Sequence, residues 1–130
     1  MNTNSTTGSQ KGRALVIDDD ELVRATVTSM LEAAGYEVLQ AEDGQQGLKL
    51  FHKHPVDLVI TDILMPFKEG IETILELRQR NQEVRIIAMT GGGSIGAMPI
   101  LDAARQLGAN AVLSKPFTKA DLLETIEKSG

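Results

Sequence analysis

Short apolar runs alternate with amphipathic segments along this chain, and that alternation limits the folds it can adopt. Five runs of four to six residues are rich in Val, Ile and Leu: ALVI (14–17), YEVLQA (36–41), DLVIT (57–61), RIIAMT (85–90) and NAVLS (110–114). Runs this short and this apolar are typical of strands that are buried on both faces. Strands of that kind occur in parallel sheets covered by helices.

A helical pattern follows each run. In the first, apolar residues recur on one face from Val23 onward, and Gly35 stands where a helix-terminating glycine belongs. The fifth opens with TKAD (118–121), which resembles a capping box. The remaining three helices are expected over residues 45–53, 71–80 and 99–108.

Strand followed by helix, five times over, predicts right-handed crossovers and an α/β fold with a parallel sheet covered on both faces. The pattern alone does not fix the order of the strands. We adopt the order 2-1-3-4-5, which is common in doubly wound sheets of the flavodoxin-like (βα)5 kind. In such sheets, binding sites lie at the carboxyl ends of the strands.

Polar residues stand at those carboxyl ends. The first strand ends in Asp18 and Asp19, the third in Asp62, the fourth in Thr90 and the fifth in Lys115. Three carboxylates from two strands suit a hard cation such as Mg²⁺, and the absence of Cys or His from this set disfavours zinc. A metal, a lysine and a hydroxyl around one carboxylate suit phosphoryl transfer, with Asp62 as the covalent acceptor.

Each of these residues has a plainer explanation when taken singly. Asp18 and Asp19 would serve as capping or first-turn acids of the following helix, which is how we interpret Asp20 and Glu21. Thr90 and Lys115 would be an ordinary strand-end threonine and a solvated lysine. Only their convergence on one edge of the sheet favours a reactive site.

Four segments, VIDDDE, VITDILMPFKEG, IIAMTG and LSKPF, resemble the signature elements of response-regulator receiver domains, in order and over roughly residues 13 to 128. The resemblance implies a two-component phosphorelay protein. Such a protein accepts a phosphoryl group from a phosphohistidine of a histidine kinase or histidine phosphotransfer protein in a Mg²⁺-dependent reaction. It is a signalling switch that catalyses its own modification, not a metabolic enzyme, and it acts on downstream proteins through contacts.

The resemblance also assigns roles to single residues. Asp62 corresponds to the phosphoacceptor. Asp19 corresponds to the direct Mg²⁺ ligand, Asp18 to the acid that holds the metal through water, and the backbone carbonyl of Leu64 to a third ligand from the protein.

Further roles concern the switch and the loops around it. Thr90 corresponds to the hydroxyl that reorients onto the phosphoryl group, and Lys115 to the lysine that pairs with its oxygens. The bond between Lys115 and Pro116 is expected to be cis, as in the family. Pro66 and Gly70 are interpreted as structural residues that shape the loop after Asp62, with Gly70 in an unusual backbone conformation.

The chain departs from the family pattern at two places. Val112 occupies the position three residues before the lysine where the usual receiver has an aromatic ring, so the coupling between Thr90 and that ring is in doubt. The loop TGGGSIGAMPI (90–100) is rich in glycine and longer than usual. Its first backbone amides, at Gly91 and Gly92, could form a nest for the phosphoryl group.

Three other functions fit the pattern of residues less well. A phosphatase of the haloacid dehalogenase type would use Asp18 and Asp20 of DDDEL, but it would leave Asp62 idle. A pseudo-receiver would bind partners without accepting phosphate, and the intact site residues argue against it. A flavin-binding flavodoxin lacks support, because no Ser/Thr/Gly phosphate loop follows the first strand.

Composition restricts the remaining classes. The chain has 130 residues, no Cys and a formal charge of −5, which fits one domain without disulfides and disfavours binding to nucleic acid. No apolar run reaches the length of a membrane helix, and a cytoplasmic protein is expected. Residues 1–12 are expected to be a disordered polar tail and residues 13–130 the receiver domain, as a stand-alone protein or a fragment of a longer regulator.

Overall fold

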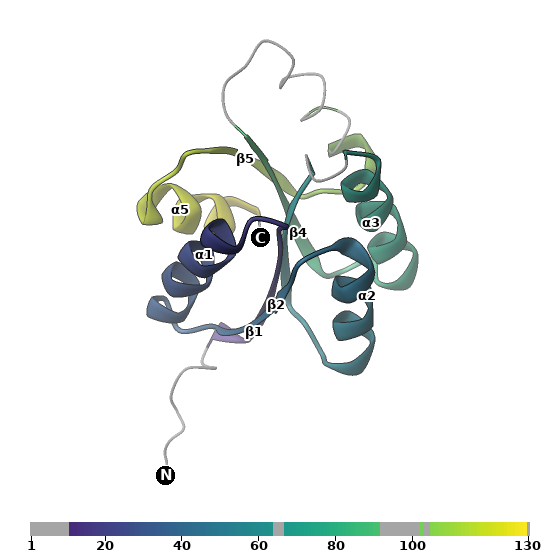
Figure 1. The fold of residues 1–130 in the computed structure, drawn as a ribbon, viewed down its shortest axis with the longest axis horizontal. Coiled ribbons are helices and arrows are strands. Elements are labelled where there is room, and N and C mark those ends of the chain that lie inside the picture. Colours follow the sequence, from purple (N-terminus) through teal and green to yellow (C-terminus); the bar gives the residue numbers. More distant parts are fainter. Residues whose placement is uncertain (1–10, 64–66, 92–101, 103–104, 130) are drawn as a thin grey trace.

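The computed structural model describes residues 11–63, 67–91, 102 and 105–129. Strands and helices alternate along this part of the chain (Figure 1). They are β1 (Arg13–Ile17), α1 (Glu21–Ala33), β2 (Glu37–Ala41), α2 (Gly44–Lys53), β3 (Leu58–Asp62), α3 (Phe67–Arg80), β4 (Arg85–Gly91), β5 (Ala111–Lys115) and α5 (Lys119–Ser129). Of the expected fourth helix, residues 102 and 105–107 are described and are helical, while its expected start at Pro99 lies outside the described residues.

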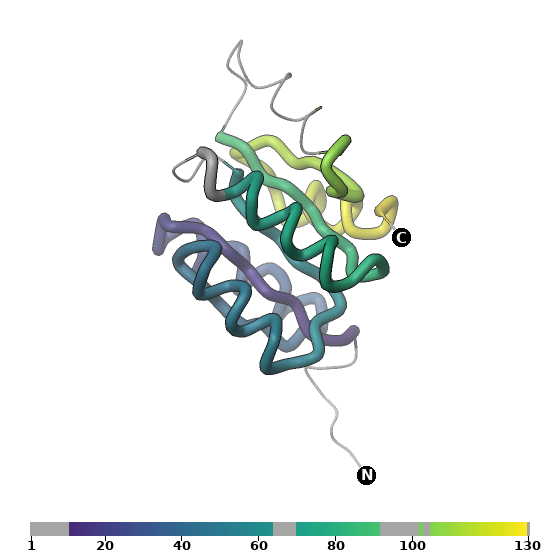
Figure 2. Tube along the Cα trace, turned by 90° about the vertical axis from the view of Figure 1, so that its right-hand side faces the viewer, coloured from purple at the N-terminus to yellow at the C-terminus, as the bar shows by residue number. Residues whose placement is uncertain are grey.

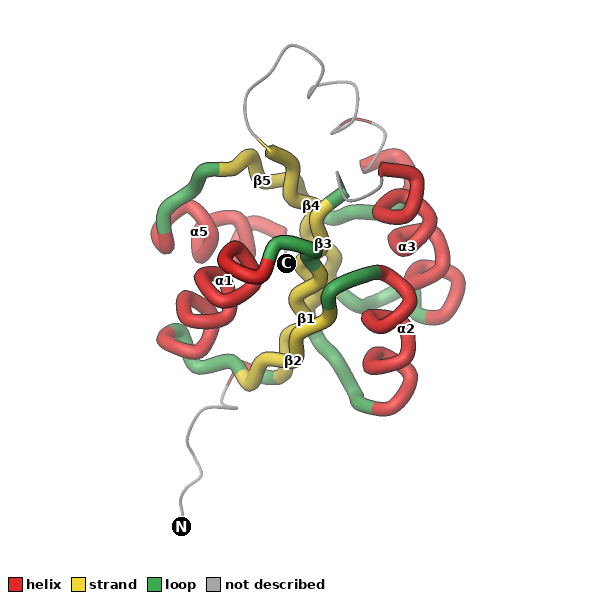
Figure 3. Tube along the Cα trace, viewed as in Figure 1, coloured by secondary structure: helices red, strands yellow, loops and turns green. Residues whose placement is uncertain are grey.

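The five strands form one parallel sheet in the order β2-β1-β3-β4-β5, which confirms the expected fold class and strand order. In register, Ile17 of β1 lies opposite Thr61 of β3, and Gly91 of β4 lies opposite Lys115 of β5. The α1 and α5 helices cover one face of the sheet, and α2 and α3 cover the other (Figures 1 and 3). Figure 2 shows the same layers after a quarter turn. The carboxyl ends of all the strands therefore point to one edge.

Two hydrophobic clusters hold the layers together. Alternate residues of each strand point to opposite faces, so Leu15 and Ile17 join the cluster beneath α2 and α3, and Ala14 and Val16 join the one beneath α1 and α5. All five residues of β3 are buried, as expected for the central strand of a sheet covered on both sides. This packing fixes the strand ends that carry the polar residues.

The boundaries of the helices follow their capping residues. Asp20 caps α1 by accepting hydrogen bonds from the backbone amides of Leu22 and Val23, which confirms its expected role. Gly35, with a φ of 102°, follows the C-terminal end of α1. The expected capping box of α5 is also present: the amide of Asp121 donates to Thr118 Oγ1, and the amide of Thr118 donates to the Asp121 carboxylate, each at 3.0 Å.

Gly70 corrects one expectation. It lies inside α3, which begins at Phe67 rather than near residue 71, and its backbone is helical rather than unusual. The reason for a glycine is space. A Cβ atom at this position would lie 2.6 Å from the Cα of Ile63 and 2.9 Å from the carbonyl oxygen of Asp62. Gly70 therefore lets α3 pack directly against the chain that leaves β3.

The amino-terminal segment is described from Lys11 onward, and residues 1–10 of the expected tail lie outside the described residues. The amide of Lys11 donates to the carbonyl of Gly35 at 3.2 Å, and the carbonyl of Gly12 accepts from the amide of Glu37 at 3.0 Å. These two residues thus contact the start of β2. Within the described ranges, every helix falls short of the length and hydropathy that a bilayer-spanning segment requires.

Candidate functional site

The turn between β1 and α1 places Asp18 inside the protein. Its side chain is fully buried, and its backbone amide donates to the carbonyl of Ala41 at the end of β2. One carboxylate oxygen, Oδ1, accepts a hydrogen bond of 2.8 Å from the backbone amide of Asp20. Because a buried carboxylate needs hydrogen bonds or a cation, these contacts explain how the chain tolerates an acid at this depth.

Three carboxylates meet at the carboxyl edge of the sheet. Oxygen atoms of Asp18, Asp19 and Asp62 all lie within 4.8 Å of one another. Asp18 and Asp62 are buried, whereas Asp19 is exposed. The expected convergence of acids from β1 and β3 is therefore present.

Lys115 supplies a positive charge to this cluster from the end of β5. Its Nζ lies 2.9 Å from Oδ2 of Asp18 and 3.3 Å from Oδ2 of Asp62. Burial lowers the pKa of Lys115, but the hydrogen bond to Asp18 and the charges of Asp62 and Asp18 outweigh it, so the pKa is raised overall. The lysine consequently remains charged throughout the neutral range and bridges the two buried carboxylates.

Thr90 lies at the same edge, on the strand beside Asp62. It follows Met89, the register partner of Asp62, and its side chain is fully buried. Within the described part of the chain, its hydroxyl oxygen has no hydrogen-bond partner. A buried hydroxyl without a partner is costly, so an oxygen-rich ligand at this edge would relieve that cost.

The structure describes only some of the other expected site residues. Leu64, Pro66 and Gly92 fall outside the described residues. Gly91 is the last residue of β4 and lies in register with Lys115. The bond between Lys115 and Pro116 is cis, as the resemblance implied.

Sequence reasoning missed Arg24. This half-buried side chain of α1 donates a hydrogen bond of 2.9 Å from Nη1 to the backbone carbonyl of Asp18. A signal was available in the sequence, because Arg24 is the only Lys or Arg between Arg13 and Lys49. An arginine one helical turn after an acidic cluster can be expected to contact that cluster.

A small apolar groove opens beside the cluster, between α1 and the segment that follows β5. We call it the α1–β5 groove. Its volume is about 250 Å³, and Leu22, at its rim, has 74% of its surface exposed. The groove is lined by Leu22, Val23, Thr26, Val27, Met30, Lys115, Pro116 and Phe117.

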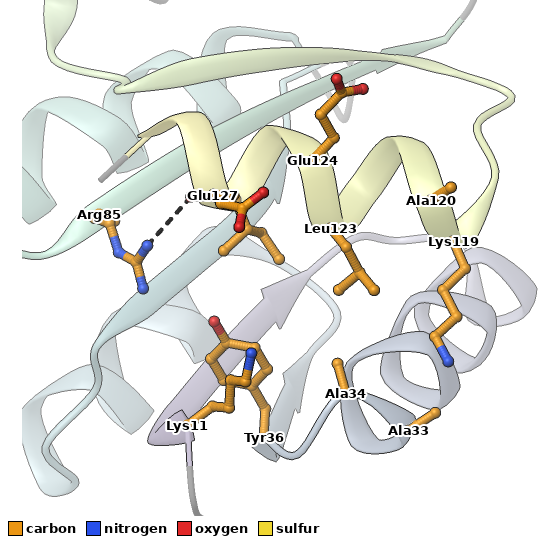
Figure 4. A pocket seen from close by; sticks show the side chains of 11 residues that line it. Lys11, Ala33, Ala34, Tyr36, Arg85, Lys119, Ala120, Leu123, Glu124 and Glu127 are labelled. Atoms are coloured by element: carbon orange, nitrogen blue, oxygen red, sulfur yellow. Dashed lines mark hydrogen bonds between the residues drawn. The ribbon is translucent and has the colours of Figure 1, made fainter.

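A larger hollow of about 790 Å³ lies between α5 and the end of α1, and none of the clustered acids lines it. Figure 4 shows Lys11 beside Tyr36, Leu123 pointing toward α1, and Arg85 donating to the carbonyl of Ile126. Its walls carry both cations and carboxylates, including Lys119 and Glu127. Arg85 opens β4, so this hollow extends to the amino edge of the sheet, away from the acids.

The acidic cluster fits a hard divalent cation. Carboxylate oxygens are the ligands that Mg²⁺ prefers, and Mg²⁺ usually keeps several waters beside one or two carboxylates. Asp18, Asp19 and Asp62 provide such oxygens, and the exposure of Asp19 leaves room for water. Both oxygens of Asp18 are already engaged, one by Lys115 and one by the amide of Asp20, so this acid would hold an ion through water rather than directly.

The model of the response regulator receiver domain matches residues 14–127. The chain belongs to this family. The match spans every described strand except the first residue of β1, and it includes all three clustered acids, Thr90 and Lys115. The receiver domain is a component of two-component signalling systems, and this chain is a member of that family of signalling switches.

Individual relatives agree with the family. The chain is 35% identical to the transcriptional regulatory protein PdtaR of Mycobacterium tuberculosis, over 88% of this chain and 55% of that protein, so it spans about half the length of that relative. It is 34% identical to the chemotaxis protein CheY of Bacillus subtilis, over 90% of this chain and 96% of that one. A receiver-domain structure from Clostridium thermocellum superimposes with a TM-score of 0.81 at 32% identity, covering 90% of this chain and 92% of that one.

Proposed function

We propose that this receiver accepts a phosphoryl group on Asp62 from a phosphohistidine of a histidine kinase or histidine phosphotransfer protein. The observation that carries the proposal is the position of the Asp62 carboxylate, which lies among two further acids and one lysine at the carboxyl edge of the sheet. A carboxylate in this setting can act as a nucleophile toward phosphorus once a cation offsets the surrounding negative charge.

The reaction is a single displacement. A carboxylate oxygen of Asp62 attacks phosphorus, and an acyl phosphate bond forms. The bond from phosphorus to the imidazole nitrogen breaks, and that nitrogen keeps the electron pair and takes up a proton. Mg²⁺, when bound, supplies positive charge to the phosphoryl oxygens. Lys115 forms an ion pair with one of these oxygens, and the hydroxyl of Thr90 donates a hydrogen bond to another.

The metal is held as the family resemblance implies. Asp19 and Asp62 would bind it directly, Asp18 would hold it through water, and the backbone carbonyl of Leu64 would be the remaining ligand from the protein. The backbone amide of Gly91, at the end of β4, would contact the phosphoryl group. Pro66 and Pro116 maintain the shape of the surrounding loops, and Gly70 lets α3 pack against the chain that leaves β3.

The α1–β5 groove is the docking surface for the phosphohistidine donor. It adjoins Lys115, it is largely apolar, and the exposed Leu22 offers a side chain for a partner helix to cover. Replacing Leu22 with Ser would slow transfer from a phosphorylated histidine domain while leaving the reaction with a small donor such as acetyl phosphate unchanged. The domain, comprising residues 13–130 in the cytoplasm, then passes the signal to a downstream protein through an altered surface.

Mass spectrometry of the intact protein tests the reaction. The protein is incubated with Mg²⁺ and acetyl phosphate, in parallel with Asp62→Asn and with an EDTA control. One phosphoryl adduct is expected in the wild type and none in the variant or in EDTA. An adduct that survives Asp62→Asn but requires Asp18 would instead indicate a phosphatase of the haloacid dehalogenase type. Absence of any adduct, from acetyl phosphate and from a phosphorylated histidine domain alike, would indicate a pseudo-receiver.

A further inference from the structure

Arg24 reaches from α1 to the backbone that carries the first two clustered acids. Its Nη1 donates to the carbonyl oxygen of Asp18 at 2.9 Å. That carbonyl belongs to the peptide group that joins Asp18 to Asp19. The hydrogen bond therefore restrains the rotation of this peptide plane, and with it the directions of the two neighbouring side chains.

The two acids depend on this restraint to different degrees. Asp18 is fixed at every polar atom: its amide contacts Ala41, its carboxylate contacts the amide of Asp20 and Lys115, and its carbonyl accepts from Arg24. Within the described part of the chain, no hydrogen bond or ion pair holds the carboxylate of Asp19. The orientation of Asp19 toward Asp62 thus rests on the backbone alone.

When a metal is bound, charge by itself gives no reason for an arginine at this place. A guanidinium close to a cation site repels the cation, so electrostatics alone would make Arg24 weaken metal binding. A half-buried arginine that donates to a main-chain carbonyl acts through geometry instead. The two effects have opposite signs, which makes them separable by experiment.

We propose that Arg24 is a positioning residue of the metal site. It holds the peptide between Asp18 and Asp19 so that the Asp19 carboxylate faces Asp62, and it thereby raises the affinity for Mg²⁺ despite its own positive charge. This inference rests on the proposed function of the acidic cluster. It adds a residue that touches neither metal nor phosphoryl group.

Titration with Mg²⁺, followed by the backbone amide signals in two-dimensional NMR spectra, tests the proposal. Replacing Arg24 with Met removes the charge and the hydrogen bond and keeps an apolar stem. The dissociation constant for Mg²⁺ is expected to rise about tenfold, as is typical when an outer-shell partner of a metal ligand is lost. Arg24→Lys, which retains a donor, is expected to recover part of the affinity.

Arg85→Met is the matched control. Arg85 is also half-buried and donates to a main-chain carbonyl, that of Ile126 at 3.2 Å, but it belongs to the amino end of β4. Its loss removes one charge and one contact of the same kind. Arg85 lies four residues along β4 from Met89, the register partner of Asp62, which is about 13 Å at about 3.3 Å per residue. The Mg²⁺ affinity should stay within about twofold, because this separation exceeds the Debye length. Well-dispersed spectra establish that each variant is folded. If Arg24→Met is not, Arg24→Gln takes its place, since a glutamine is too short to reach the same carbonyl.

Phosphorylation supplies a second readout. With the acceptor and Lys115 intact, Arg24→Met should need about tenfold more Mg²⁺ for half-maximal labelling by acetyl phosphate yet reach the same final yield. Unchanged or tighter Mg²⁺ binding in Arg24→Met would overturn the positioning role and leave the proposed function standing. If the wild-type protein itself fails to bind Mg²⁺, the metal site fails and this inference fails with it.

Discussion

Replacing Asp19 with Asn should stabilise the metal-free protein while it abolishes the stabilising effect of Mg²⁺. In the absence of a metal, the exposed Asp19 carboxylate adds a negative charge within 4.8 Å of two buried carboxylates. Lys115 already engages those two acids and not Asp19. The net effect of the Asp19 charge on the folded state is therefore repulsive.

The size of this repulsion follows from the distance. Two unit charges about 4.8 Å apart repel by about 0.9 kcal/mol in water and by about 3.5 kcal/mol at an effective dielectric constant of about 20. Asp19 is solvent-exposed, so the lower figure applies to each neighbour, and the attraction to Lys115 and to Arg24 offsets part of the total. We expect Asp19→Asn to raise the free energy of unfolding by about 1 kcal/mol in EDTA.

Magnesium should reverse the order. A ligand that binds only the folded state at about ten times its dissociation constant adds about 1.4 kcal/mol to the free energy of unfolding. The wild type gains this contribution and Asp19→Asn does not. The variant should therefore be the more stable protein in EDTA and the less stable one in saturating Mg²⁺.

Urea unfolding followed by circular dichroism measures both effects at low ionic strength. Glu83→Gln is the control, because it removes one exposed negative charge just before β4, at the opposite edge of the sheet. It should change stability by less than about 0.5 kcal/mol and leave the Mg²⁺ response intact. If Asp19→Asn is equal to or less stable than the wild type in EDTA, the carboxylates do not repel as the geometry requires.

Four further perturbations follow from contacts in the structure. Lys115→Met should lower the free energy of unfolding by about 3 kcal/mol in urea titrations, because it removes the cation that bridges two buried carboxylates, and an unchanged midpoint would contradict that. The pKa of Lys115 is raised in the folded protein, so the stability from its ion pairs should be complete below pH 10.5, the ordinary value, and be lost as the pH rises through the raised pKa. The urea midpoint of the wild type should therefore fall over this range, and that of Lys115→Met should not. Gly70→Ala should lower the free energy of unfolding by about 1–3 kcal/mol, because the added Cβ atom would press against Ile63. An unchanged melting temperature would refute the close packing. Thr118→Ala should cost about 1 kcal/mol by removing the cap of α5, and no shift in the melting temperature would show that the capping bonds contribute little.

The fold was predictable because its signals are local. Short runs of Val, Ile and Leu separated by amphipathic segments specify buried parallel strands and covering helices, and the structure has them within one residue of the expected strand ends. The acids at two of those ends were predictable for the same reason, since a parallel sheet brings its carboxyl ends together. The order of the strands depends on contacts between distant segments and had to be adopted from other proteins.

The sequence did not predict the features that depend on segments packing closely against each other. Gly70 was expected to adopt an unusual backbone angle, but it is helical and is needed because the chain after β3 passes within van der Waals distance. Arg24 was missed because it contacts a main-chain carbonyl, and a contact of that kind does not depend on the type of the partner residue. Leu64 and Pro66 lie outside the described residues, so their assignments remain predictions.

The origin of Lys115 in the last strand has a consequence for folding. The three carboxylates all come from β1 and β3 and the turn between β1 and α1, so a partly folded chain containing only the first half of the sheet would assemble the acids without their cation. Such an intermediate would carry the repulsion among the acids without the offsetting attraction of Lys115. We expect this to disfavour partial structures and to make folding of the sheet more cooperative than its stepwise strand order would suggest.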